Sequence, residues 1–153
     1  MSEYLATTVW QREGRGFVGD DYSRGHFWHF DGGTTVPASA SPHIVPPPNS
    51  VAENVDPEEA FVASLSSCHM LFFLSLAAKR GVVIDSYRDQ ASGYLEENGD
   101  GRLAMTRVVL RPQATYVGGD PDPALIERLH HRAHELCFIA NSVTADVTME
   151  IVA

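Results

Sequence analysis

The sequence has few basic residues, few cysteines and no long uninterrupted apolar run. Eleven lysines and arginines stand against twenty aspartates and glutamates, so the formal net charge is -9. An acidic surface repels phosphate backbones and anionic lipid heads, and we therefore expect neither nucleic acid nor a membrane as a partner. The remaining composition, with 44% hydrophobic residues, is that of a globular protein and excludes a disordered chain.

The length of 153 residues predicts a single domain over 1–153. The N-terminal sequence MSEYLATTVW has neither a basic leader nor an apolar stretch long enough for export, so we expect a cytoplasmic protein. The most apolar stretch, Ala60–Ala78, is interrupted by serines, a cysteine and a histidine, and we read it as too polar for a membrane span. Two cysteines are too few for a disulfide scaffold, so they are either inert core residues or redox groups.

Alternating residues predict a first strand around Leu5–Val9 and a second at His26–Phe30. The segment Val36–Asp56 carries five prolines and predicts a long loop, either a lid or a stiffened surface connection. Asp56 and Pro57 then provide a helix start, and Arg80-Gly81 the stop. Because this helix is apolar or small on nearly every side, we expect it in the middle of the protein.

Two long strands, Tyr87–Leu95 and Leu103–Val117, are predicted around an Asn-Gly turn. A second helix runs from Asp122 to about Phe138 with a continuous apolar stripe, and an alternating strand follows at Val143–Ile151. The order of elements predicts an α+β fold with antiparallel sheets, a buried central helix and a second helix.

Cys68 lies about halfway along the predicted central helix and is followed by His69. Free cysteine is among the most buried residue types, so an inert core thiol is one interpretation. A helix lowers the pKa of a thiol at its N-terminus, and Cys68 is about three turns further along. If Cys68 is reactive, a cation from elsewhere in the protein must stabilise its thiolate.

Cys137 falls on the apolar stripe of the second helix, flanked by His130 and His134. Three interpretations stay open. Cys137 is a core residue with the histidines at a solvated edge; or these three residues bind zinc together with Cys68 or His69; or Cys137 resolves an oxidised Cys68 by forming a disulfide.

Two segments carry a resemblance to a known family. Pro57 to Cys68 reads P-E-E-A-F-V-A-S-L-S-S-C, and C-F-I-A-N-S-V follows from Cys137 near the end of the next helix. Together they resemble the OsmC/Ohr family of hydroperoxide-resistance proteins, over essentially the whole chain. Phe138 stands where the family usually has a proline, which indicates a divergent branch.

The resemblance implies an OsmC-like intertwined homodimer and a cysteine-based peroxidase that reduces organic hydroperoxides. Cys68 would be the peroxidatic cysteine, Cys137 the resolving one, and Glu58 the partner of a catalytic arginine. Arg24 is placed first for that arginine and Arg15 second. No metal or organic cofactor is implied, whereas an external dithiol is needed as reductant.

The spacing of two of these residues adds a constraint. Glu58 and Cys68 lie ten residues apart, which is about 15 Å on one unbroken helix. Either the helix breaks near Ser64–Ser67, or two chains share the site, as in a homodimer. The alternative from another class is a non-catalytic dimeric module that binds a small hydrophobic ligand or a metal.

Overall fold

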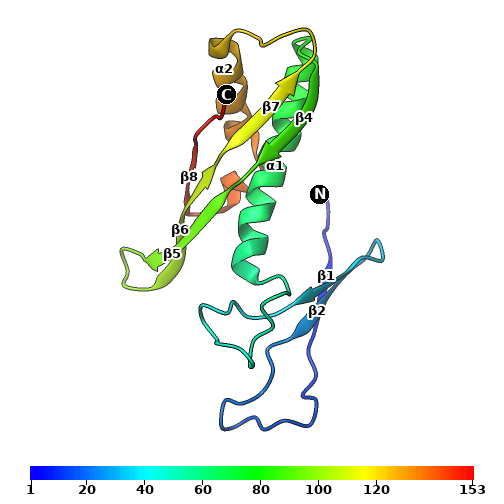
Figure 1. Cartoon of the computed structure of the whole chain (residues 1–153), viewed down its shortest axis with the longest axis vertical. Coiled ribbons are helices and arrows are strands. Elements are labelled where there is room, and N and C mark those ends of the chain that lie inside the picture. The colour runs from blue at the N-terminus through cyan, green and yellow to red at the C-terminus, as the bar shows by residue number, and fades with distance from the viewer. The chain divides into compact units, whose positions relative to one another are not determined.

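The computed structural model describes all 153 residues, which form two compact units, Met1–Ala60 and Phe61–Ala153. In chain order (Figure 1), the elements are β1 (Ala6–Val9), β2 (His26–Phe30), β3 (Thr35–Ala38), α1 (Pro57–Lys79), β4 (Ile84–Asp89), β5 (Ser92–Glu97), β6 (Leu103–Leu110), β7 (Pro112–Tyr116), α2 (Pro123–Leu136), the short 3-10 helix η1 (Ala140–Ser142) and β8 (Asp146–Met149). The α+β class predicted from the sequence is confirmed.

The N-terminal unit contains one antiparallel sheet in the order β1-β2-β3. The expected loop Val36–Asp56 begins later than predicted, because its first residues belong to β3. Pro37 lies in this edge strand and pairs with Phe27. Proline has no N–H to donate, and an edge strand tolerates this because it lacks a neighbour on one side. The rest of the segment folds back along β3 through the pairing of Ala38 with Val55.

Helix α1 begins and ends where the sequence predicts. The Asp56 carboxylate accepts a hydrogen bond from the backbone N–H of Glu59 at 2.8 Å, which caps the first turn. Gly81, with a φ of 71°, follows the last turn in the left-handed conformation that glycine adopts without strain.

The expectation that α1 is buried on every side is wrong for the single chain. Its buried residues form one stripe at a spacing of four, namely Leu65, His69, Phe73 and Ala77. Leu71, on another side, is 61% exposed. The expectation that this stretch is too polar to span a membrane is also wrong. By length and composition alone, α1 is long and apolar enough to cross one. The mostly buried core helix of a soluble protein meets the same criterion, whereas 22% of the apolar window of α1 is buried in the single chain, along the stripe of four residues.

In the C-terminal unit, the two long predicted strands are each divided in two. Figure 1 shows the paired β4 and β7 continuing into β5 and β6. The division falls at Arg111, whose backbone N–H donates to the Asp89 carboxylate at 2.6 Å instead of to a neighbouring strand. Pro112 follows and has no N–H to contribute. The sheets are therefore separate ladders, β4-β7 and β5-β6-β8.

The last strand is shorter than predicted and pairs differently. β8 lies parallel to β6, with Val108 opposite Val147, so this sheet is mixed rather than antiparallel. A parallel neighbour requires a long crossover, which α2 and η1 supply here.

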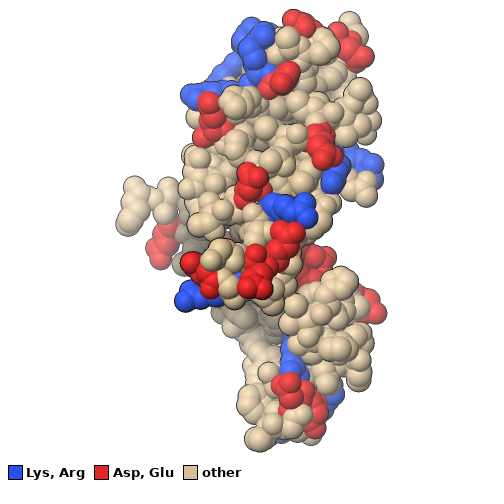
Figure 2. Space-filling view, turned by 90° about the vertical axis from the view of Figure 1, so that its left-hand side faces the viewer, with Lys and Arg blue, Asp and Glu red and all other residues tan.

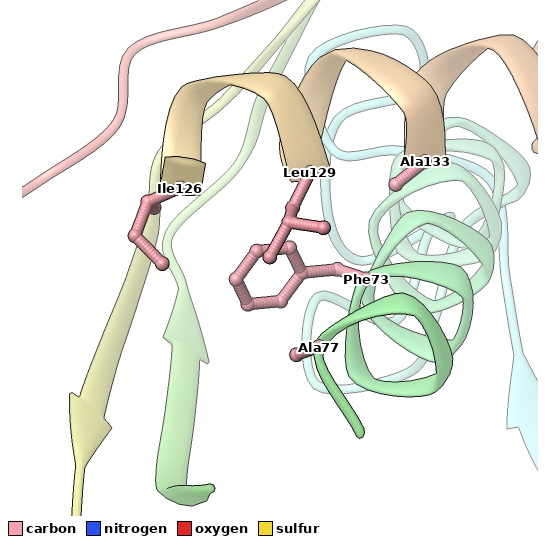
Figure 3. Close-up of a cluster of buried hydrophobic side chains, with 5 residues drawn as sticks. All are labelled: Phe73, Ala77, Ile126, Leu129 and Ala133. Carbon is pink, nitrogen blue, oxygen red and sulfur yellow. The ribbon is translucent and has the colours of Figure 1, made fainter. Parts of the chain in front are cut away.

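Two hydrophobic clusters hold the C-terminal unit together. One joins α1 to α2, and Figure 3 shows the Phe73 ring of α1 pointing at Leu129 of α2. The other packs Leu65 of α1 against Val108 and Leu110 of β6 and Val147 of β8. The α1 stripe therefore contacts both the second helix and the mixed sheet.

Uncharged side chains cover most of the face shown in Figure 2, with acidic and basic groups interspersed among them. Several large apolar side chains of the single chain are open to solvent, including Leu71 at 61% and Phe27 at 48%. Single exposed apolar residues are normal on a protein surface. The large exposed apolar side chains of this chain are numerous enough to leave apolar area for a partner to cover.

Candidate functional site

The two cysteines are 69 residues apart in the sequence and come together in the C-terminal unit. Cys68 projects from the middle of α1, and Cys137 is the residue at which α2 ends. Both are free thiols; Cys137 is buried and Cys68 is partly exposed. The pair thus consists of one thiol that solvent reaches and one that it does not.

The Cys137 sulfur lies in a polar backbone environment inside the core. Burial raises the pKa of the Cys137 thiol above its ordinary value, and the neighbouring Cys68 thiol raises it further. Backbone N–H groups of Ile139 and Ala140 oppose the rise, and the Ala140 N–H donates to the sulfur at 3.4 Å. The thiols are therefore adjacent, and the backbone N–H groups of Ile139 and Ala140, which follow α2, can stabilise a negative charge on Cys137.

A histidine pair lies beside the cysteines. His69 Nε2 and His130 Nδ1 are 2.9 Å apart, the two rings are inclined by only 2°, and both residues are 1% exposed. The His130 ring also stacks on Phe73 at 3.8 Å between centroids. The interpretation of His130 as part of a solvated edge is therefore wrong.

Burial keeps both histidines neutral. Burial, aided by the neighbouring His134 and opposed by Asp89, lowers the pKa of His69 from 6.5 to about 4. Burial together with His69 lowers the pKa of His130 to about 3. At neutral pH these histidines add no positive charge beside Cys68, so they do not replace a catalytic cation.

Asp89 connects α1 to the division between the strands. Its carboxylate accepts from the hydroxyl of Ser66 at 2.5 Å and from the backbone N–H of Arg111 at 2.6 Å. Ser66 precedes Cys68 by two residues. The helix carrying the exposed thiol is thus fixed to the sheet by a charged hydrogen bond. The sequence pattern did not single out Asp89, because its partners are remote in the chain.

Aromatic side chains flank the thiols. Phe72, one turn after Cys68, meets Phe138, the residue after Cys137, edge to face with 4.9 Å between ring centroids. Phe138 is 70% exposed, so its ring is the member of this aromatic pair that faces solvent.

The candidate arginines lie in the N-terminal unit, and each is already hydrogen-bonded. Arg24 donates to the Asp20 carboxylate at 2.7 Å and to the Tyr22 carbonyl at 2.6 Å, and its guanidinium lies 3.7 Å from the centre of the Tyr22 ring. The Arg24 side chain is 13% exposed and Asp20 is 82% exposed. Arg15 donates to the Asn49 side chain.

Arg24 also lines an open groove of about 470 Å³ in the N-terminal unit. Its lining is mainly apolar and includes the aromatic side chains of Trp10, Phe17 and Tyr22, which are in mutual contact. Grooves of this size, apolar with a few polar groups, are typical of small-molecule sites.

Glu58 does not form an ion pair with Arg24 in the single chain. One of its carboxylate oxygens, Oε2, is buried without a hydrogen-bond partner. Helix α1 runs unbroken through Ser64–Ser67, so a break in the helix does not bring Glu58 to Cys68. The roles of Glu58, Arg24 and Arg15 stay predictions.

The zinc interpretation finds no support in the geometry. No group of three or more histidine, cysteine, aspartate or glutamate side chains is arranged to hold a metal ion. The hydrogen bond between His69 and His130 occupies two of the nitrogens that zinc would need.

Known proteins resemble the chain in sequence and in fold. The family model for OsmC-like proteins matches residues 50–152. An OsmC-like protein of unknown function from Vibrio cholerae is 54% identical, with 99% of this chain and 100% of that chain covered and a TM-score of 0.97. No curated protein matches.

More distant solved structures share the fold. They include an organic hydroperoxide resistance protein from Bacillus subtilis, 22% identical with a TM-score of 0.66 over 99% of this chain and 98% of that chain. Another, from Legionella pneumophila, is described as an organic hydroperoxide resistance protein and is 15% identical with a TM-score of 0.75 over 100% and 98%. The matched segment contains both cysteines, and the chain belongs to the OsmC-like family, which includes organic hydroperoxide resistance proteins.

Proposed function

We propose that the protein is a cysteine-based peroxidase that reduces organic hydroperoxides to alcohols. The observation that carries this proposal is the contact between a partly exposed thiol, Cys68, and a buried one, Cys137, on the two helices of one unit. This arrangement suits a two-cysteine cycle, because the accessible thiol can react with the substrate and the adjacent buried thiol can then form a disulfide with it.

The cycle has two steps on the protein. The Cys68 thiolate attacks the distal peroxide oxygen, the O–O bond breaks, and the alkoxide takes a proton and leaves as an alcohol. Cys68 is now a sulfenic acid. The Cys137 sulfur then attacks the Cys68 sulfur, hydroxide leaves and takes up the Cys137 proton as water, and a disulfide remains. An external dithiol reduces this disulfide and restores both thiols.

Apolar surroundings favour alkyl or lipid hydroperoxides over hydrogen peroxide. Phe72 and Phe138 contact each other next to the two cysteines, and Phe138 is exposed. A partly exposed aromatic wall attracts the alkyl part of a substrate and gains nothing from hydrogen peroxide.

A homodimer would complete the site. Glu58 and Cys68 are about 15 Å apart on a straight helix, so an Arg24–Glu58 pair of one chain serves Cys68 of another chain more easily than its own. In the dimer, the guanidinium would exchange the exposed Asp20 for the unpartnered Glu58 oxygen and favour the Cys68 thiolate by its positive charge. Light scattering at micromolar concentration should give twice the 16.7 kDa chain mass, and a monomer mass contradicts this part of the proposal.

The decisive experiment follows the sulfur atoms. One equivalent of cumene hydroperoxide should produce a disulfide between Cys68 and Cys137 in mass spectra of the wild type. Cys68→Ser should consume no peroxide, whereas Cys137→Ser should be oxidised once, label with a sulfenic-acid probe at Cys68 and then stop. Turnover in Cys68→Ser contradicts the peroxidase, and unlabelled Cys137→Ser removes Cys137 from the resolving role.

The second candidate function is non-catalytic binding of a small hydrophobic ligand, and the aromatic groove beside Arg24 favours it. Calorimetric titration with an aromatic hydrophobic probe separates the two functions. Binding that is lost in Trp10→Ala and unaffected in Cys68→Ser, without any peroxide consumption by the wild type, supports a binding module.

A further inference from the structure

One hydrogen bond joins the two helices that carry the cysteines. His69 is the residue after Cys68 on α1, and His130 lies seven residues before Cys137 on α2. Seven residues are about two helical turns, so His130 and Cys137 lie on the same side of α2. The contact between the histidines therefore lies on the interface where the two sulfurs meet.

The direction of this hydrogen bond follows from burial. The other ring nitrogen of His69, Nδ1, is buried and has no partner. A proton on that nitrogen would be a buried donor without an acceptor, which proteins avoid. The proton therefore lies on Nε2, and His69 donates to the Nδ1 of His130.

The surroundings hold the pair in one arrangement. The His130 ring is nearly parallel to Phe73, inclined by 6° at 3.8 Å, and Phe73 belongs to the same α1 stripe as His69. Figure 3 shows Phe73 packed beneath α2 among Leu129 and Ala133. Sliding α1 along α2 would break the bond and the stack together, leaving a buried N–H unsatisfied.

We propose that the His69–His130 pair is a positioning pair, which fixes the placement of α1 against α2 and thereby sets how readily Cys137 reaches the Cys68 sulfur. The inference deepens the proposed function in that the disulfide is a step of the peroxidase cycle. It assigns no proton transfer to the histidines, because both remain neutral at working pH.

The test measures the disulfide equilibrium without any peroxide. The protein is equilibrated with mixtures of reduced and oxidised glutathione at pH 7, where one glutathione disulfide oxidises both thiols and yields two glutathione thiols. At half-oxidation, the square of the reduced-glutathione concentration divided by the glutathione-disulfide concentration gives the effective concentration of one protein thiol at the other. All samples are kept well below their urea unfolding midpoint.

Two variants of one residue separate the hydrogen bond from the ring. His130→Phe keeps a ring to stack on Phe73 and removes the acceptor, whereas His130→Asn removes the ring and retains an amide oxygen near the position of Nδ1. We expect the effective concentration to fall about tenfold in His130→Phe, which corresponds to the loss of one hydrogen bond. It should stay within about threefold of wild type in His130→Asn.

The matched control is His131→Phe, since His131 is the next residue and its side chain is 72% exposed. This control should leave the equilibrium unchanged. If His130→Phe does not fold, His69→Leu removes the same bond from the other helix and should lower the effective concentration equally. A folded His130→Phe or His69→Leu with wild-type equilibrium overturns the inference, because a merely structural bond changes stability alone.

The outcomes also separate this inference from the proposed function. A wild type that forms the disulfide with glutathione and consumes no hydroperoxide refutes the peroxidase and leaves the positioning pair intact. A wild type that consumes hydroperoxide, with equal glutathione equilibria in all variants, refutes the positioning pair and leaves the peroxidase intact.

Discussion

Acid should destabilise this protein through its buried histidine pair well before the carboxylates titrate. His69 and His130 have pKa values of about 4 and about 3 in the folded protein, against 6.5 in the absence of burial. Because the folded-state pKa values are lowered, the unfolded chain binds protons first as the pH falls. The stability is therefore complete above pH 6.5 and declines below it.

The size of the effect follows from these values. At pH 5 the unfolded chain has both histidines protonated and the folded protein has both neutral. At about 1.4 kcal/mol for each pKa unit, each histidine costs about 2 kcal/mol between pH 7 and pH 5, and the pair about 4 kcal/mol. The other titratable groups acting on His69 are His134 of α2 and Asp89 of β4.

Urea unfolding at pH 7 and at pH 5, at one fixed protein concentration, measures this loss. His130→Asn removes one of the two titrating groups and should lose about 2 kcal/mol less than the wild type over the same interval. His131→Asn, at an exposed position, should retain the wild-type dependence. Equal pH dependence in the wild type and His130→Asn would refute the assignment of buried neutral histidines.

Three further changes test the packing and the caps. Phe73→Ala should lower the free energy of unfolding by about 3–5 kcal/mol in urea titrations, because the ring is fully buried between α1 and α2; a loss below about 1 kcal/mol contradicts that packing. Asp56→Ala should cost about 1 kcal/mol by removing the α1 cap, and Asp56→Asn should restore most of it; two equally destabilised variants would contradict a capping role. Gly93→Ala should cost about 1–3 kcal/mol, since an added Cβ meets Val62 at 2.4 Å and Met105 at 2.7 Å, and thermal melts that match the wild type show that the neighbours move freely.

Local signals in the sequence were sufficient for much of the fold. The capping residue Asp56 and the stop at Gly81 predicted α1 within a residue, and the Asn-Gly turn predicted the β5-β6 hairpin. These signals depend on residues close in the chain, so they predict the local structure whatever tertiary contacts the segment makes. The pairing of β8 with β6 depends on where α2 places the chain, and alternation alone does not distinguish parallel from antiparallel partners.

The candidate site was predictable in its cysteines and not in its histidines. The resemblance paired Cys68 with Cys137, and the structure brings them together. His130 was assigned to a solvated edge, although its spacing of four from Ile126 places it on the buried stripe. Its burial is stabilised by His69, a partner 61 residues away that no local pattern reveals.

The parallel pairing of β8 with β6 also orders events during folding. The β5-β6 hairpin closes a short turn, whereas Arg107 of β6 meets Asp146 of β8 only after the intervening 38 residues, with α2 among them, have folded back. Contacts of long sequence separation carry a larger loop-closure cost and form later. Cys137 lies inside this late-closing loop, so the nascent chain exposes Cys68 on a helix before its partner thiol arrives. Until residue 137 is synthesised, the chain therefore has a single thiol, Cys68, which can exchange with small disulfides such as glutathione disulfide.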